Sequence, residues 1–173
     1  MDKLWAPWRM AYVGKGEEPA DRGCFFCRAW RETGKERENL LLARSGDCLV
    51  MLNRYPYSNA HLLIAPSLHL GSLEEMPPEI GAQLWNLIVF AKTALARAIS
   101  PHGFNIGVNQ GRVAGAGVLD HLHIHVVPRW NGDVNFMPVL AEVKIIPQAL
   151  EETWEKLAPH FQGLSPFERN PAE

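Results

Sequence analysis

The chain has 173 residues, of which 47% are hydrophobic and 21% are charged. These values are typical of one globular domain with a buried core, and they exclude a disordered or fibrous chain. The formal net charge of -2 and a pI near 6.4 give no general attraction to nucleic acid or to anionic membranes, so neither is expected as a partner.

The N-terminal stretch and the cysteines indicate the compartment. MDKLWAPWRMAYV carries two charges near its start and lacks the long apolar core of a secretory signal. No segment approaches the roughly 20 apolar residues of a membrane span. Three cysteines, two of them spaced as Cys24-x₂-Cys27, suit a reducing compartment better than a disulfide framework. We therefore expect a cytoplasmic protein, with residues 1–23 as an extension ahead of the domain core.

Four segments have the composition of β-strands, at residues 48–53, 61–66, 104–109 and 121–127. The first two are joined by RYPYSNA, a polar turn region that contains a proline. A connection of this kind favours an antiparallel hairpin.

Two segments have the periodicity of amphipathic helices. Apolar residues recur at steps of three and four across 79–99, between a Pro-Pro pair and Pro101. The segment 148–161 has one apolar stripe, formed by Leu150, Trp154, Leu157 and Phe161. Strands mixed with a long helix predict an α+β domain, in which helices pack against one face of an antiparallel sheet.

The last strand-like segment, HLHIHVV, places a histidine at every second position. On a strand, His121, His123 and His125 share one face, and the apolar residues between them point into the core. Pro128 is expected to end the strand, because it cannot donate to a central ladder. Ordinary half-buried strands also alternate, but they use Thr, Ser, Lys or Glu, so three histidines predict a functional site.

Imidazole suits chemistry at neutral pH because its ordinary pKa is about 6.5. A neutral ring can attack phosphorus, and a protonated neighbour can stabilise the oxyanion or protonate the leaving oxygen. The competing interpretation is metal binding, since histidines two apart on a strand can share one Zn²⁺. From the spacing alone, both uses stay open.

The segment 109–120, NQGRVAGAGVLD, leads directly into the histidines. Its glycines let backbone N–H groups approach an anion, and Arg112 supplies a planar donor fork. A glycine-rich connection is also an ordinary turn. Its place before the histidines favours phosphate binding.

Cys24 and Cys27 form half of a zinc site, since a tetrahedral site needs two more ligands. Cys48 stands alone in a predicted strand and is assigned to the core. His69 and His121 are therefore the candidate remaining ligands. The alternative is a pair of reduced, unligated thiols.

HLHIHVVPR resembles the signature of the histidine triad (HIT) family, and NRYPYSNAHLLIAPSLH and NQGRVAGAG resemble its ribose-binding and phosphate-contacting segments. The resemblance runs from about residue 24 to 130. It implies a single HIT domain over residues 1–173. Its fold would be an antiparallel sheet of about five strands, with a long helix and the C-terminal helix at about 148–161 packed on it.

LWAPWRMAYV and PRWNGDVNF resemble a bacterial subgroup that cleaves dinucleoside polyphosphates, such as diadenosine tetraphosphate, with water or inorganic phosphate. The resemblance implies that His123 attacks the α-phosphate and forms a nucleotidyl-histidine intermediate, while the His121 carbonyl accepts its Nδ1–H. His125 and His61 would manage charge and protons around the phosphate. The predicted nucleotide contacts are Asn53 at the ribose, Asn109, Gly115 and Gly117 at the phosphate, and Trp130 beside a base.

The same resemblance implies a structural zinc ion on Cys24, Cys27, His69 and His121, and a homodimer that continues the sheet across a two-fold axis. A Mg²⁺ ion carried by the polyphosphate is the second metal considered. Ala116-Gly117-Val118 stands where many relatives supply a Ser, Thr or Gln side chain to the phosphate, so only backbone N–H groups remain there. The alternative functions are an adenosine phosphoramidate hydrolase and a nucleotide sensor without turnover.

Overall fold

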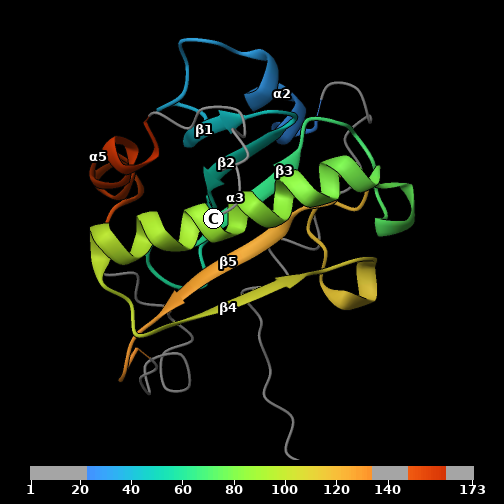
Figure 1. Ribbon diagram of the computed structural model, residues 1–173. Helices are drawn as coiled ribbons and strands as arrows, with labels where there is room; N and C mark the ends of the chain where they lie inside the picture. Colours follow the sequence, from blue (N-terminus) through green and yellow to red (C-terminus); the bar gives the residue numbers. More distant parts are fainter. Residues whose placement is uncertain (1–22, 134–147, 163–173) are drawn as a thin grey trace, which may run out of the picture.

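The computed structural model describes residues 23–133 and 148–162 (Figure 1). The predicted N-terminal extension therefore lies, except for Gly23, outside the described residues. No helix in the described part is long and apolar enough to cross a membrane. The elements in chain order are α2 (Phe25–Arg31), β1 (Leu41–Ser45), β2 (Cys48–Leu52), β3 (Leu62–Pro66), η2 (Leu73–Glu75), α3 (Pro78–Ile99), β4 (Gly103–Val108), η3 (Arg112–Ala114), β5 (Ile124–Arg129) and α5 (Leu150–Phe161).

The five strands form one antiparallel sheet in the order β1-β2-β3-β5-β4. This arrangement confirms the predicted α+β class. The hairpin of β2 and β3 is also confirmed, with Val50 opposite Ile64 at its centre. Both predicted helices are present as α3 and α5, and they pack on the same face of the sheet (Figure 1).

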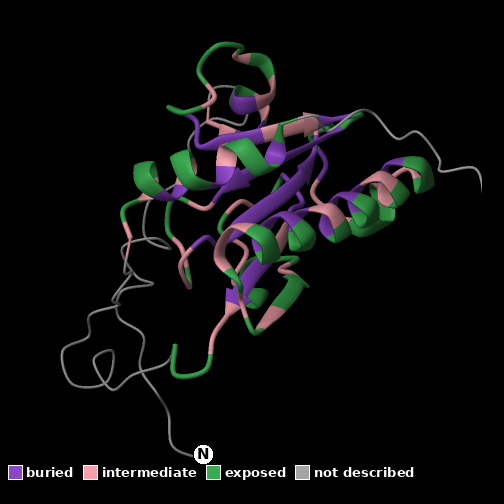
Figure 2. Cartoon of the chain, turned by 60° about the vertical axis from the view of Figure 1, so that its left-hand side comes forward, coloured by how far each residue is buried: buried purple, intermediate pink, exposed green. Residues whose placement is uncertain are grey.

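The central strands are buried on both faces because apolar residues occupy successive positions. Every residue of β2 is buried. Cys48, Val50 and Leu52 point to the core under α3 and α5, whereas Leu49 and Met51 contact the cluster around Phe26 of α2. Figure 2 shows this buried centre against the exposed outer side of the helices. The short helix α2 thus covers part of the second face, which the periodicity did not predict.

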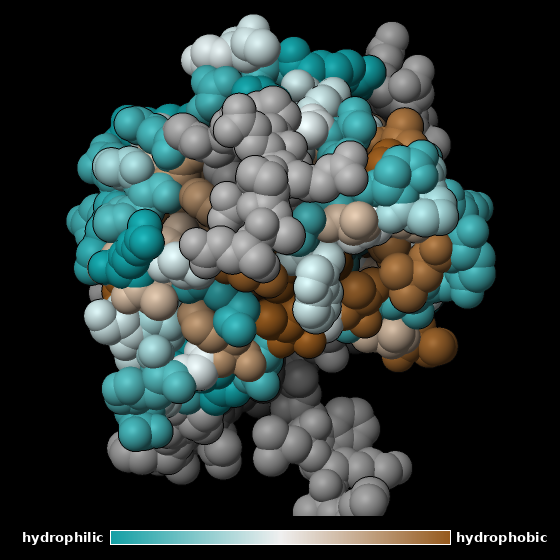
Figure 3. Space-filling model, viewed as in Figure 1, coloured by the Kyte–Doolittle hydropathy of each residue, from teal (hydrophilic) through white to brown (hydrophobic). Residues whose placement is uncertain are grey.

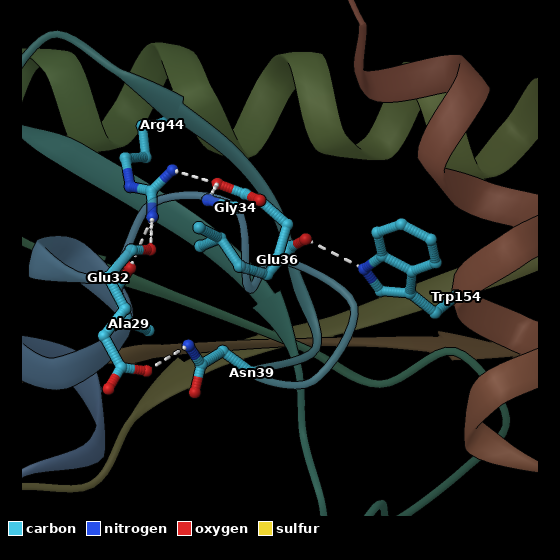
Figure 4. Close-up of polar contacts among 8 residues, drawn as sticks. Ala29, Glu32, Gly34, Glu36, Asn39, Arg44 and Trp154 are labelled. Atoms are coloured by element: carbon cyan, nitrogen blue, oxygen red, sulfur yellow. Dashed lines mark hydrogen bonds and ion pairs between the residues drawn. The ribbon is translucent and has the colours of Figure 1, made fainter.

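Polar contacts tie both α2 and α5 to β1 (Figure 4). The guanidinium of Arg44 donates to the carbonyls of Ala29 and Glu32 at 2.7 and 2.6 Å, and to Glu36 Oε1 at 2.9 Å. Trp154 Nε1 donates to the carbonyl of Leu41 at 2.8 Å. Carbonyls at the end of α2 have no partner within the helix, so Arg44 satisfies groups that would otherwise be unpaired.

The sequence-based strand limits need three corrections. β1 was not among the predicted segments. β5 begins at Ile124, because the N–H of Leu122 donates to the carbonyl of Leu70 at 2.7 Å rather than to a ladder partner. Pro128 lies within β5. It is tolerated there because β3 reaches only as far as Val126, so Pro128 has a neighbouring strand on one side alone.

Candidate active site and metal-ligand cluster

The three histidines lie at and just before the start of β5, on the face of the sheet opposite α3. His125 pairs with Leu63, which belongs to the α2 cluster. The ring of Phe26 packs against His121 and His123, with centroid distances of 4.9 and 5.0 Å. Because α2 covers them in this way, His121 and His123 are buried.

The ring of His123 is held by one backbone hydrogen bond. Its Nδ1 lies 2.9 Å from the carbonyl oxygen of His121 and donates to it. In the neutral ring this leaves the lone pair on Nε2. Burial lowers the pKa of His123, although the bond to the His121 carbonyl opposes that shift. The ring is therefore neutral at pH 7, the form in which an imidazole can attack an electrophile.

His125 and His61 form a directed hydrogen-bond chain. The backbone N–H of Tyr57 donates to His61 Nδ1 at 3.0 Å, so the proton of the neutral His61 ring is on Nε2. That nitrogen lies 2.9 Å from Nδ1 of His125. The proton of His125 is then on Nε2. Burial, and secondly the charge of His123, lower the pKa of His125 to about 4.

His121 has a different set of partners. Its Nε2 donates to the carbonyl of Pro66 at 2.9 Å, which leaves the Nδ1 lone pair facing Cys24 Sγ at 3.2 Å and Cys27 Sγ at 3.5 Å. His69 Nδ1 lies 3.3 Å from the same nitrogen. Burial is the main cause that lowers the pKa of His121 to about 4, so the ring stays in the neutral form that binds metals.

Among the described residues, four side chains are close enough together to hold one metal ion: Cys24, Cys27, His69 and His121. We call them the Cys/His cluster. Their ligand atoms all lie within 4.8 Å of one another. A tetrahedral zinc site with bonds of about 2.0–2.3 Å has ligand–ligand edges of about 3.3–3.8 Å. The contacts of 3.2–3.5 Å that join His121 to the other three residues, and the contact of 3.3 Å between Cys27 Sγ and His69 Nδ1, match those edges, so the residues fit zinc.

The two predicted asparagines lie on opposite sides of the histidine chain. Asn53, just after β2, has its Nδ2 3.3 Å from His61 Nδ1, and its Oδ1 accepts the N–H of Tyr55. Asn109, just after β4, has its side-chain amide 3.4 Å from His125 Nε2. Both positions are therefore adjacent to the histidines.

The predicted glycines of the loop and Trp130 make no hydrogen bond or ring contact with the histidines among the described residues. Gly111 and Gly115 have φ values of 85° and 87°, a region that favours glycine. The N–H of Gly115 is used within the turn, donating to the carbonyl of Arg112. Gly117 is exposed, and its N–H has no acceptor within the described residues. Trp130 follows β5, in a turn where Asp133 accepts its backbone N–H.

Sequence reasoning missed two aromatic residues at this site. Tyr57 stacks on His125, with a centroid distance of 5.6 Å and an interplanar angle of 20°, and it lies 4.6 Å from His61. Phe26 packs on the other two histidines. Tyr57 lies within the turn segment RYPYSNA, and Phe26 lies between the two cysteines of the Cys24-x₂-Cys27 pair. An aromatic residue inside a functional motif was the signal available.

Comparison with known proteins identifies the family of this chain. Residues 34–132 match the HIT domain, which is more than half of the chain. The chain belongs to the HIT family. A solved structure, a Zn-bound histidine triad family protein from Mycobacterium smegmatis, aligns with a TM-score of 0.62 and 25% identity, covering 80% of this chain and 93% of that one.

Two relatives of this chain are enzymes whose names state the nucleotide on which they act. The chain is 35% identical over 162 residues to AP-4-A phosphorylase of Mycobacterium tuberculosis, covering 91% of this chain and 83% of the relative. It is 26% identical over 135 residues to adenosine 5'-monophosphoramidase hnt1 of Schizosaccharomyces pombe, covering 78% and 96%. The predicted family is thereby confirmed, as is homology to an enzyme that acts on nucleotides.

Proposed function

We propose that this protein cleaves dinucleoside polyphosphates such as diadenosine tetraphosphate at the α-phosphate, through a nucleotidyl-His123 intermediate. The observation that carries the proposal is the bond from His123 Nδ1 to the His121 carbonyl, which leaves the lone pair of the neutral ring on Nε2, the atom that would attack phosphorus. The similarity to AP-4-A phosphorylase over most of the chain supports the substrate class.

In the first step, Nε2 of His123 attacks the α-phosphorus, a P–N bond forms, and the bond from phosphorus to the bridging oxygen breaks. The Nδ1–H stays on the ring, and the His121 carbonyl stabilises the positive charge that develops there. The leaving nucleotide departs with the bond electrons. The Nε2–H of His125 is placed to donate to a phosphoryl or leaving oxygen.

In the second step, water or phosphate attacks the same phosphorus, the proton of an attacking water is released to solvent, and the P–N bond breaks. This returns the electron pair to Nε2 of His123. A water nucleophile gives AMP, whereas phosphate gives ADP. Splitting one difficult substitution into two easier ones is the advantage of the covalent intermediate. Asn53 is assigned to the ribose and Asn109 to the phosphoryl oxygens, with the exposed N–H of Gly117 as a further donor.

Incubation with diadenosine tetraphosphate, with and without inorganic phosphate, tests the proposal when products are identified by mass. ADP that appears only with phosphate identifies a phosphorylase, and AMP with ATP in its absence identifies a hydrolase. Absence of any product would contradict the proposal and favour the sensor.

An adenosine phosphoramidate hydrolase is the second candidate, favoured by the similarity to adenosine 5'-monophosphoramidase. The same nucleophile would attack phosphorus and expel an amine. Release of AMP from lysine-linked AMP, with diadenosine tetraphosphate untouched, would replace the first proposal with this one.

The Cys/His cluster is proposed to hold a structural zinc ion. Zinc would crosslink the start of α2 to the segment before β5, two parts of the chain that are about 100 residues apart. Metal analysis of protein purified without added metal should give about one equivalent of zinc per chain. A small fraction of an equivalent would contradict it. A Mg²⁺ ion carried by the polyphosphate substrate stays a prediction.

A homodimer is proposed through β4 and α3. β4 is an edge strand of the sheet, and Ile106 on it is 42% exposed. Trp85 and Val89, one helical turn apart on α3, are 66% and 53% exposed. Hydrophobic surface gathers over this part of the molecule (Figure 3). A second copy would cover it and extend the sheet.

Sedimentation velocity tests the dimer. The wild type should sediment as a dimer, and Ile106→Glu should shift it toward monomer. A monomeric wild type at micromolar concentration would contradict the proposal. A cytoplasmic location is proposed as well, because three cysteines, two of them in a Cys-x₂-Cys pair, suit a reducing compartment better than a disulfide framework. Cell fractionation tests it.

A further inference from the structure

A cavity of about 270 Å³ lies beside the histidine chain, and the mechanism above does not use it. It is lined by Tyr57, Ser58, Asn105, Val127, Arg129 and Asp133. Tyr57 is the wall that it shares with the active site, since the same ring stacks on His125. The cavity is therefore adjacent to the place where the substrate would react.

The direction of β5 places the cavity farther along the same face of the sheet. His125, Val127 and Arg129 alternate with residues that point the other way, and Asn105 is opposite Val127 on β4. At about 3.3 Å per residue, Arg129 lies about 13 Å beyond His125 along the strand. A group in this cavity could thus be joined by an extended polyphosphate to a phosphorus atom held at the histidines.

The polar side of the cavity is linked by hydrogen bonds and carries one positive and one negative charge, on Arg129 and Asp133. Arg129 donates to both carboxylate oxygens of Asp133, at 2.6 and 2.8 Å, and to Asn105 Oδ1 at 2.7 Å. The hydrogen bonds from Arg129 and from the Trp130 N–H, with the charge of Arg129 in addition, lower the pKa of Asp133 to about 2, so its charge is present at every physiological pH. Because the guanidinium of Arg129 is already paired with this carboxylate, the residues that line the cavity offer a phosphate group no unpaired positive charge.

We propose that this cavity binds the distal nucleoside of a dinucleoside polyphosphate, the half that leaves in the first step. A nucleoside is uncharged, offers an aromatic face to Tyr57, and has donors and acceptors that suit a fixed amide, guanidinium and carboxylate. The volume is slightly below the about 300–1,000 Å³ of pockets that enclose whole drug-sized ligands. One nucleoside fits such a space, whereas a dinucleotide does not.

This inference rests on the proposed function and adds a second nucleoside site to it. The test compares diadenosine tetraphosphate with adenosine 5'-tetraphosphate. Both carry the same α-phosphate and the same number of phosphates. They differ in the distal nucleoside and in the additional ionisable oxygen of the terminal phosphate that its removal leaves, a difference that is the same for every variant compared. The quantity measured is the ratio of kcat/KM for the first substrate to kcat/KM for the second.

Two variants alter the cavity by different means. Asn105→Ala removes an amide and frees one side of Arg129, and Ser58→Phe fills the space without touching the ion pair. Each should lower the ratio by about tenfold, mostly through KM for diadenosine tetraphosphate, while kcat/KM for adenosine tetraphosphate changes less than about twofold. Arg37→Gln, in an exposed ion pair with Glu155, is the control and should leave the ratio unchanged.

A ratio that is unchanged in both cavity variants overturns the inference and leaves the proposed function intact. Equal losses for the two substrates overturn it as well, because the residues would then support the histidines rather than a nucleoside. A wild type that cleaves neither substrate overturns the proposed function, and this inference falls with it. Because Ser58→Phe and Asn105→Ala perturb different contacts, misfolding of one leaves the other to decide.

Discussion

His121 and His125, the two ends of the histidine run, carry the same side chain but are suited to different roles. Burial lowers the pKa of both His121 and His125 to about 4, so their proton affinities do not distinguish them. Their hydrogen-bond partners do. The Pro66 carbonyl takes the proton of His121 on Nε2 and turns Nδ1 toward two thiols, whereas His61 turns Nδ1 of His125 into an acceptor. The neighbouring donors and carbonyls, rather than the pKa values, thus suit the two rings to the two proposed roles: metal binding at His121, the metal end, and proton transfer at His125, the proton-transfer end.

Substitution of His123, which lies between the two ends, should abolish turnover without affecting metal binding. His123→Ala removes the nucleophile, for which the site has no substitute, so turnover of diadenosine tetraphosphate should fall by at least about 10³-fold. Zinc content should not change, because the Cys/His cluster does not include this side chain. Steady-state kinetics and metal analysis on one preparation check both statements. A variant that keeps more than a tenth of the activity would show that another group attacks phosphorus.

The proton-transfer end is tested by His61→Ala. The substitution leaves His125 Nδ1 without the donor that sets its tautomer, and kcat should fall by about 10²-fold, within the range of general acid–base catalysis. KM should change little. His160→Ala, an exposed histidine on α5, is the matched control. If both variants retain wild-type kcat, the hydrogen-bond chain has no part in proton transfer.

The protonation of His125 can be followed directly. Its folded pKa of about 4 lies below the ordinary value of about 6.5, so between these pH values the unfolded chain binds a proton that the folded chain does not. This residue should therefore destabilise the fold as pH falls through that window and have no such effect above it. The side-chain NMR signals of His125 should titrate near pH 4, assigned by their loss in His125→Gln. A midpoint near 6.5 would show that burial does not lower the pKa of His125.

How far sequence reasoning reached depends on the range of the interactions. The hairpin of β2 and β3 and the helix α3 follow from local periodicity and turn composition, and both were predicted. β1 and α2 were missed, because α2 has only seven residues and no side-chain cap, and β1 has only five. Their positions are fixed by tertiary contacts such as those of Arg44.

The candidate site shows the same division. The alternating histidines could be identified as a site from their spacing, but the start of β5 could not. His121 leaves the ladder because its ring and the next backbone N–H bond to Pro66 and Leu70. The approach of Cys24 to His121, 97 residues apart, also depends on the folded chain. Cys-x₂-Cys alone leaves the two remaining ligands open.

The metal end is tested by Cys27→Ser, which should lower zinc content and thermal stability together. A metal present at 100 times its dissociation constant stabilises the folded state by about 2.7 kcal/mol. Losing that binding should lower Tm by about 5–11 °C for a chain of this size. Cys48→Ser is not a matched control, since that thiol is buried in the core, so a chelator added to the wild type provides the comparison. Equal Tm values with and without the chelator would show that the cluster does not depend on metal.

The smallest effect is expected at Arg44, which connects the metal end to the sheet through α2. Arg44→Met keeps the length of the aliphatic stem but leaves the carbonyls of Ala29 and Glu32 without their donor. Such a loss costs about 1–3 kcal/mol in the free energy of unfolding. Arg37→Gln breaks an exposed ion pair instead and should cost less than about 1 kcal/mol. Urea denaturation of both variants measures the difference. If α2 positions Phe26 and Cys27 as the structure indicates, Arg44→Met should also weaken zinc binding, and Arg37→Gln should not.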